Sequence, residues 1–167
     1  MQLNTCVFSK EFWLDKKSVS LFVFLALLPN LVGLISFSTE FGFKFHVFQY
    51  VIFLAALIYG PFGGAVSGGF GSIFTALTLN NPYLILGNII LGAVFGLLLK
   101  KGVPLFKAGL TAFLAQIPFL YFTDVYLIGM NSTVVQKLII ALFLGNLVWL
   151  FLAKFTFNKI KLYFQSN

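Results

Sequence analysis

The sequence predicts an all-α integral membrane protein, with one domain over residues 1–167 built as a single bundle of six transmembrane helices. Three observations lead to this fold class. Hydrophobic residues make up 60% of the chain and charged residues only 9%, whereas ordinary globular domains carry about 25% charged residues. Six apolar stretches have lengths near that of a membrane-spanning helix. The lysines between these stretches are distributed as six crossings would require.

The six expected spans are separated by proline, glycine and clusters of polar residues. A helix needs about 20 apolar residues to cross the hydrocarbon core. The stretches show no two-residue alternation of the kind that a β-barrel requires, so helices are the expected spanning element. The expected spans are residues 18–37, 45–58, 61–79, 82–99, 104–122 and 133–157.

The distribution of lysine predicts the orientation of the bundle. The chain has 11 basic residues, and all of them are lysines. Cytoplasmic segments of membrane proteins carry the excess of positive charge, and six spans place three lysine groups on one side. Both termini are then cytoplasmic, and the chain is expected to be a multi-pass protein of the cell membrane. We expect the lipid bilayer as a partner and no binding of nucleic acid. The three groups are Lys10, Lys16 and Lys17; Lys100, Lys101 and Lys107; and Lys154, Lys159 and Lys161.

The glycine-rich stretch YGPFGGAVSGGFG, residues 59–71, is predicted to form part of a helix. Pro61 suits the first helical position, where its missing N–H is not needed. Small residues then recur every fourth position, a spacing that lets membrane helices approach closely. We expect them to pack helices together within the chain, with a subunit-docking face as the alternative. A phosphate-binding loop is rejected because Phe74 stands where a third glycine would be required. The expected packing residues are Gly60, Gly64, Gly68 and Ser72 on one span and Gly92 and Gly96 on the next, where Asn88 has the same spacing.

Several activities are excluded by what the sequence lacks. It has no P-loop motif for ATP, and we expect none of its four acidic residues near the bilayer midplane, where proton-coupled carriers keep their ionisable groups. A single cysteine and a single histidine cannot build a metal site from these residue types. We therefore expect neither an enzyme nor a self-powered pump, with no metal and no cofactor bound by this chain.

Polar residues in spans four to six form the candidate solute site. At 1.5 Å of rise per residue, Asn88 and Gln116 each lie roughly 9 Å below the outer ends of their spans, close to the level of Lys137. A few polar anchors in an apolar, aromatic bowl are typical of a small-molecule pocket. The candidate residues are Asn88, Gln116, Tyr121, Asp124, Tyr126, Asn131, Gln136 and Lys137, with His46 from the loop after span one.

Structural roles compete with binding at these positions. Lys137 can extend to the membrane interface or pair with Asp124, and Asn88 and Gln116 can hydrogen-bond neighbouring helices without any ligand. His46 has a solvated loop position as its alternative. The lysines Lys44 and Lys137 favour a carboxylate or phosphate on the solute, and the aromatic residues favour a ring.

The segments LAALIYGPFGGAVSGGFGSIF and ILGNIILGAVFGLLLKKG resemble a known family, the S-components of energy-coupling factor (ECF) transporters. Gly60-Pro61, Gly64 and Gly68 match that family's GP-x-x-G-x-x-x-G pattern at the start of the third helix, and Gly92 and Gly96 match its glycine-containing fourth helix. The resemblance covers residues 48–102. The family's Ala-xxx-Ala motif in the first helix is missing from this sequence.

This resemblance implies a membrane-embedded, high-affinity solute-binding subunit of an ABC-type importer. Such subunits bind a vitamin or related micronutrient from outside and associate with a transmembrane coupling protein and two ATPase subunits, which use the ATP. The alternative is a non-transport membrane scaffold, similar to the rod-shape-determining (MreD-like) proteins. An unrelated secondary carrier is a third reading, which the lack of an acidic residue at the midplane disfavours.

Overall fold

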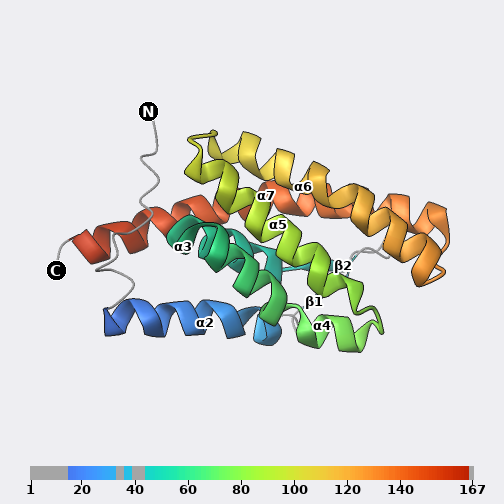
Figure 1. The fold of residues 1–167 in the computed structure, drawn as a ribbon, viewed down its shortest axis with the longest axis horizontal. Coiled ribbons are helices and arrows are strands. Elements are labelled where there is room, and N and C mark those ends of the chain that lie inside the picture. Colours follow the sequence, from blue (N-terminus) through green and yellow to red (C-terminus); the bar gives the residue numbers. More distant parts are fainter. Residues whose placement is uncertain (1–14, 33–35, 39–43, 166–167) are drawn as a thin grey trace.

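The computed structural model describes residues 15–32, 36–38 and 44–165 (Figure 1). Within this part of the chain the elements are helical apart from one short antiparallel hairpin. In chain order the elements are α2 (Lys16–Val32), β1 (Ser36–Ser38), β2 (Lys44–His46), α3 (Phe48–Gly71), α4 (Ile73–Thr78), α5 (Tyr83–Lys100), α6 (Leu105–Phe122), the π-helix η1 (Thr123–Leu127) and α7 (Ser132–Gln165).

Four helical segments are long and apolar enough to cross a membrane, so the chain is a multi-pass membrane protein. Their bounds are Phe48–Thr78, Tyr83–Lys100, Leu105–Leu127 and Ser132–Leu162. Lipid contact explains why large apolar side chains such as Leu77 and Phe151 are exposed along their outer faces. α2, with 17 mostly apolar residues, lies against this group.

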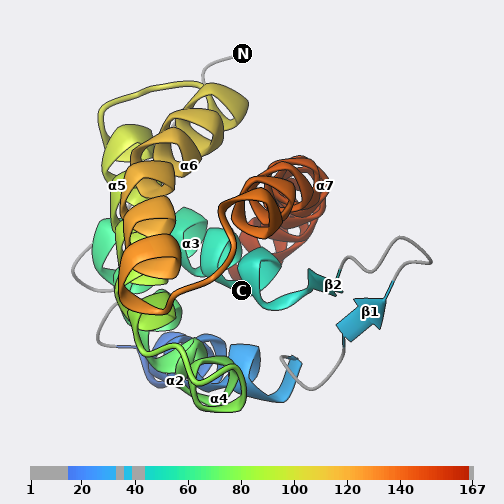
Figure 2. The same ribbon diagram turned by 90° about the vertical axis from the view of Figure 1, so that its right-hand side faces the viewer.

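A sharp bend divides α3 at Gly60. Gly60 has φ 68° and ψ −156°, a conformation that is essentially restricted to glycine. Eight residues of straight helix span about 12 Å, yet a Cβ at Gly64 would lie 2.8 Å from that of Ala56. The expected spans 45–58 and 61–79 therefore correspond to two helical parts that meet at Gly60. The first part runs from β2 into the middle of the bundle in Figure 2.

The first part of α3 is the core of the molecule. Every residue from Phe48 to Gly60 except the half-buried Tyr50 is buried. The Phe53 ring packs edge-on against Phe95 of α5, with 4.9 Å between ring centroids. Tyr50 donates a hydrogen bond to Thr156 of α7 over 2.8 Å. A helix that is hydrophobic on all sides needs neighbours on all sides, and α2, α5 and α7 supply them.

The second part of α3 packs on α5 through direct backbone contact. A Cβ at Gly64 would collide with the carbonyl of Gly92, and a Cβ at Gly92 would collide with that of Gly64. A Cβ at Gly68 would meet the Asn88 carbonyl, and one at Gly96 would lie 2.5 Å from the Pro61 nitrogen. The two helices therefore run antiparallel, with their backbones in contact at these glycines.

α2 runs parallel to the second part of α3 and is joined to it by side-chain hydrogen bonds. The Tyr59 hydroxyl donates to the Ser18 carbonyl over 2.6 Å, and the Ser67 hydroxyl donates to the Leu25 carbonyl over 2.8 Å. Asn30 bridges the break between α3 and α4, because it donates to the Phe70 carbonyl and accepts from the Phe74 N–H.

The helix directions bring the described lysine groups to one end of the bundle. Ser18, near the start of α2, lies beside Tyr59 of α3. Two residues after Tyr59, Pro61 lies beside Gly96, near the end of α5. The Lys154 ammonium group is 6.0 Å from the centre of the Phe106 ring at the start of α6. Lys16, Lys100, Lys107 and Lys154 therefore share the end of the bundle at which α7 ends in Figure 1.

Several predicted boundaries differ from the structure. The first span was expected to reach residue 37 and the second to begin at residue 45, but residues 36–38 and 44–46 pair as strands with Ser36 opposite His46. The helix expected to end at Phe122 continues as η1 to Leu127. α7 reaches Gln165 instead of residue 157. The predicted start of the third span at Pro61 agrees with the structure, because the non-helical Gly60 separates two helical parts of α3 at this point.

We expect Gly92→Ala to destabilise the protein by about 1–3 kcal/mol, because the added methyl group forces two backbones apart. The matched control is Gly87→Ala on the same helix, whose Cβ would meet Gln116 Nε2 at an ordinary 3.4 Å. Thermal unfolding in detergent or nanodiscs measures both changes. Equal stability of the two variants would contradict the backbone contact.

We expect Gly60→Ala to destabilise the protein by about 1–3 kcal/mol for a different reason. Nothing lies within 4 Å of a Cβ at Gly60, so the cost comes from the backbone conformation alone. Chemical or thermal unfolding with Gly87→Ala as the reference measures this cost. A variant as stable as the reference would show that the bend does not require glycine.

Candidate functional site

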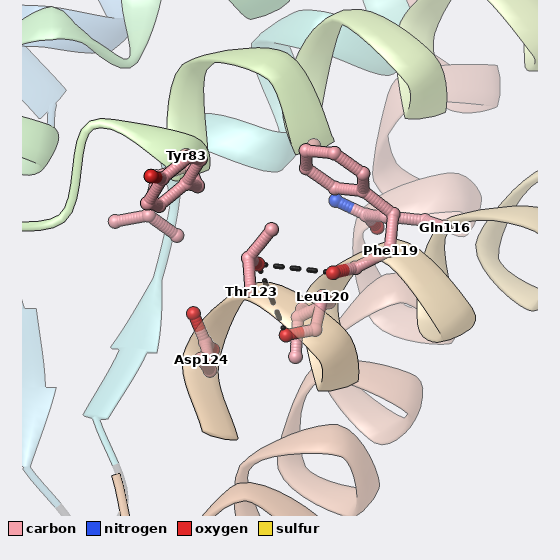
Figure 3. A pocket seen from close by; sticks show the side chains of 8 residues that line it. Tyr83, Gln116, Phe119, Leu120, Thr123 and Asp124 are labelled. Atoms are coloured by element: carbon pink, nitrogen blue, oxygen red, sulfur yellow. Dashed lines mark hydrogen bonds between the residues drawn. The ribbon is translucent and has the colours of Figure 1, made fainter. Parts of the chain in front are cut away.

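A polar recess lies between the first turns of α5 and the last turns of α6, at the end of the bundle opposite the lysine groups. Figure 3 shows its side chains. Its cavity volume is about 10 Å³, which is room for about one water molecule. The recess is lined by Tyr83, Leu84, Gly87, Gln116, Phe119, Leu120, Thr123 and Asp124.

The π-helix η1 places Asp124 at this recess. The Thr123 hydroxyl donates to the carbonyls of Phe119 and Leu120 over 3.0 and 3.2 Å. The Ile128 N–H reaches back five residues to the Thr123 carbonyl, as in a π-helix. Gly129 has φ 78° and ends the segment, so that the Met130 N–H can bond the Asp124 carbonyl, as at many helix ends. Asp124 thus belongs to the helical segment and not to a solvated loop.

Asn81 holds the Asp124 carboxylate. The Asn81 Nδ2 group donates to Asp124 Oδ1 over 2.7 Å, and Asn81 Oδ1 accepts from the Tyr83 N–H over 3.1 Å. This second bond orients the amide so that its donor faces the carboxylate. Asp124 is only 2% exposed, and no ion pair of its carboxylate is found within the described residues. A buried carboxylate normally has a cation or several donors as partners.

Gln116 lies on α6, eight residues or about two helical turns before Asp124 of η1, and close to Gly87 of α5. It is 3% exposed, and its Oε1 atom has no hydrogen-bond partner within the described residues. Its Nε2 atom is on the side of Gly87, where the absence of a side chain leaves space. The recess therefore combines a carboxylate, a hydroxyl and an amide with the rings of Tyr83 and Phe119.

Asn88 lies away from this recess, between α5 and the α3–α4 junction. Its Nδ2 group donates to the Ser72 hydroxyl over 2.8 Å, and that hydroxyl donates to the Gly68 carbonyl. The interhelical hydrogen bond that was the alternative for Asn88 is present. Ser72 thus contributes a side-chain contact where the neighbouring glycines contribute backbone contact.

The other candidate residues are spread over the surface. Tyr126 is 68% exposed, and Tyr121 is half-buried. Asn131 accepts a hydrogen bond from the Thr133 N–H at the start of α7. Gln136 and Lys137 are exposed on the first turns of α7, and the predicted alternative of a Lys137–Asp124 pair is replaced by the Asn81–Asp124 bond. His46 lies in β2, and its side chain is outside the described part of the structure.

Sequence reasoning missed Asn81 and Thr123. Asn81 stands in the sequence NNP just before α5, where an asparagine is usually assigned to the turn alone. Thr123 directly precedes the only acidic residue in the second half of the chain. Its position near the end of a span was a usable signal, because a threonine in a helix can bond the backbone carbonyls of the preceding turn.

A second hollow is an apolar groove on the outer face between α3 and α5. Its cavity volume is about 410 Å³, and Phe62, Val66, Phe70 and Ile89 are among the side chains that line it. It offers no polar anchor for a solute. The described residues also contain no group of three or more His, Cys, Asp or Glu side chains that could hold a metal ion.

The chain matches no protein-family model, no curated protein and no solved structure in the comparisons made with them.

We expect Asn81→Ala to destabilise the protein by about 1–3 kcal/mol, because it leaves the buried carboxylate without its donor. Asp124→Leu in the same background should lose less stability than it does in the wild type, since the two side chains act as a pair. A double-mutant cycle of thermal unfolding measures this coupling. Additive effects of the two substitutions would contradict the pairing.

Proposed function

We propose that this protein is the solute-binding subunit of an ECF-type ABC importer. In this proposal it crosses the cell membrane six times, and both of its termini are cytoplasmic. The observation that carries the proposal is the polar recess at the end of the bundle opposite the lysine groups. The lysine-rich end corresponds to the cytoplasm. The recess then opens toward the outside, where such a subunit receives a vitamin or related micronutrient.

The arrangement of α3 supports the six crossings of this proposal. The bend at Gly60 separates two arms, and the helices that follow alternate in direction. α2, the two arms of α3, α5, α6 with η1, and α7 supply the six segments. The residues of the family pattern, Gly60-Pro61, Gly64 and Gly68, are those that form the bend and the contact with α5.

The proposed role needs partner proteins. The sequence has no P-loop motif for ATP, so a coupling protein and two ATPase subunits would supply the energy. This chain would capture the solute and would catalyse no reaction. Gln116 and Asp124 are the predicted binding residues that the structure brings to one recess. Asn88, with its bond to Ser72, supports the bundle instead.

Affinity purification from the native membrane tests the proposal. We expect the tagged protein to co-purify with ATP-hydrolysing subunits and to retain a small solute that native mass spectrometry detects. Gln116→Leu should lower the retained solute at least tenfold, because the replacement removes a buried polar anchor. It should leave the ATPase association unchanged.

A matched control for this experiment is Gln136→Ala, which changes an exposed residue of α7. Recovery of cell-wall or cytoskeletal proteins without ATPases or solute would contradict the importer and support the scaffold alternative. Solute uptake that persists after loss of the cellular ATPase subunits would likewise contradict it.

A further inference from the structure

We infer that the recess between α5 and α6 binds a positively charged nitrogen, of the size of an –NH₃⁺ group, with Asp124 as its counter-ion. This inference rests on the proposed function and names the chemical class of the solute for that site. It differs from the carboxylate or phosphate that Lys44 and Lys137 suggested from the sequence.

The charge of the recess is the first argument. Asp124 is almost completely buried within a membrane-spanning segment, and its described side-chain partner is the neutral Asn81 amide. An isolated carboxylate is costly to bury and is normally paired with a cation. Lys137 is exposed on α7 and forms no described bond to it. A cation brought by the solute would complete the pair.

The other polar groups of the recess also favour a donor. The Thr123 hydroxyl already donates its hydrogen to backbone carbonyls, so its remaining capacity is as an acceptor. The Gln116 Oε1 atom has no partner within the described residues, and a half-turn of the amide would bring it to the Gly87 side. An ammonium group has three donors and no acceptor, so it suits a recess whose free polar capacity is that of acceptors.

The aromatic rings and the size of the recess narrow the class further. Tyr83 and Phe119 line the recess, and aromatic faces attract cations. A cavity of about 10 Å³ admits a group of about the size of a water molecule. A primary ammonium group fits this space, whereas a quaternary ammonium group is too large. The remainder of the solute would lie outside the recess.

Thermal unfolding of the purified full-length protein in nanodiscs tests this inference with simple probes. The probes are methylammonium chloride, tetramethylammonium chloride, sodium chloride and potassium chloride at equal ionic strength. We expect methylammonium to raise the unfolding temperature of the wild type by about 3 °C near saturation. The tetramethylammonium ion and the inorganic cations should give no such rise.

Two variants locate the effect. Asp124→Asn keeps the shape but removes the charge, and it should abolish the methylammonium shift. Gly87→Ala keeps the charge and places a methyl group in the recess beside Gln116, and it should reduce the shift at least threefold. Gln136→Ala, on the exposed face of α7, should retain the full shift. Because each variant is compared with and without the probe, a general loss of stability does not affect the result.

Four outcomes would overturn the inference. They are the absence of a methylammonium shift in the wild type, an equal shift in Asp124→Asn, an equal shift with tetramethylammonium, and an equal shift with sodium or potassium. The last outcome would identify an inorganic cation site. Co-purification of the ATPase subunits is independent of all four, so the importer proposal and the ammonium proposal can fail separately.

Discussion

Direct contact between the backbones of α3 and α5 is the constraint on which the rest of the structure depends. In a bilayer, apolar side chains gain little by leaving lipid, so helices associate through close packing. Gly64 and Gly92 allow this approach because neither has a side chain. The bend at Gly60 then places the first arm of α3 in the middle of the bundle, where α2, α5 and α7 cover it.

The recess between α5 and α6 depends indirectly on the contact between α3 and α5. α5 is held by α3 along one face, and it presents Tyr83 and Gly87 to α6 on another. The π-helix at the end of α6 shifts the register of the last turn, so that the Asp124 carboxylate accepts a hydrogen bond from the Asn81 amide. π-Helical turns are rare and occur frequently at functional sites. The polar groups of the recess therefore depend on two local irregularities in otherwise regular helices.

Composition and small-residue spacing were sufficient to predict an all-helical membrane protein and the glycines that face another helix. They placed a boundary between two helices at Gly60-Pro61, but they could not predict how sharply the chain bends there, because a glycine-proline pair is compatible with a loop and with a tight bend. The Asn81–Asp124 bond joins residues 43 positions apart, and no local pattern specifies such a partner. Lys137 was placed at the correct end of α7, but helical depth alone does not decide which way a side chain faces.

Asn30 has a consequence for how the chain is assembled in the membrane. Its amide joins the Phe70 carbonyl and the Phe74 N–H, which are 40 and 44 residues further along the chain. During synthesis α2 is complete well before these partners emerge, so its polar side chain has no protein partner at that stage. The contacts of Asn30 with the break between α3 and α4 can therefore form only after residue 74 has been synthesised.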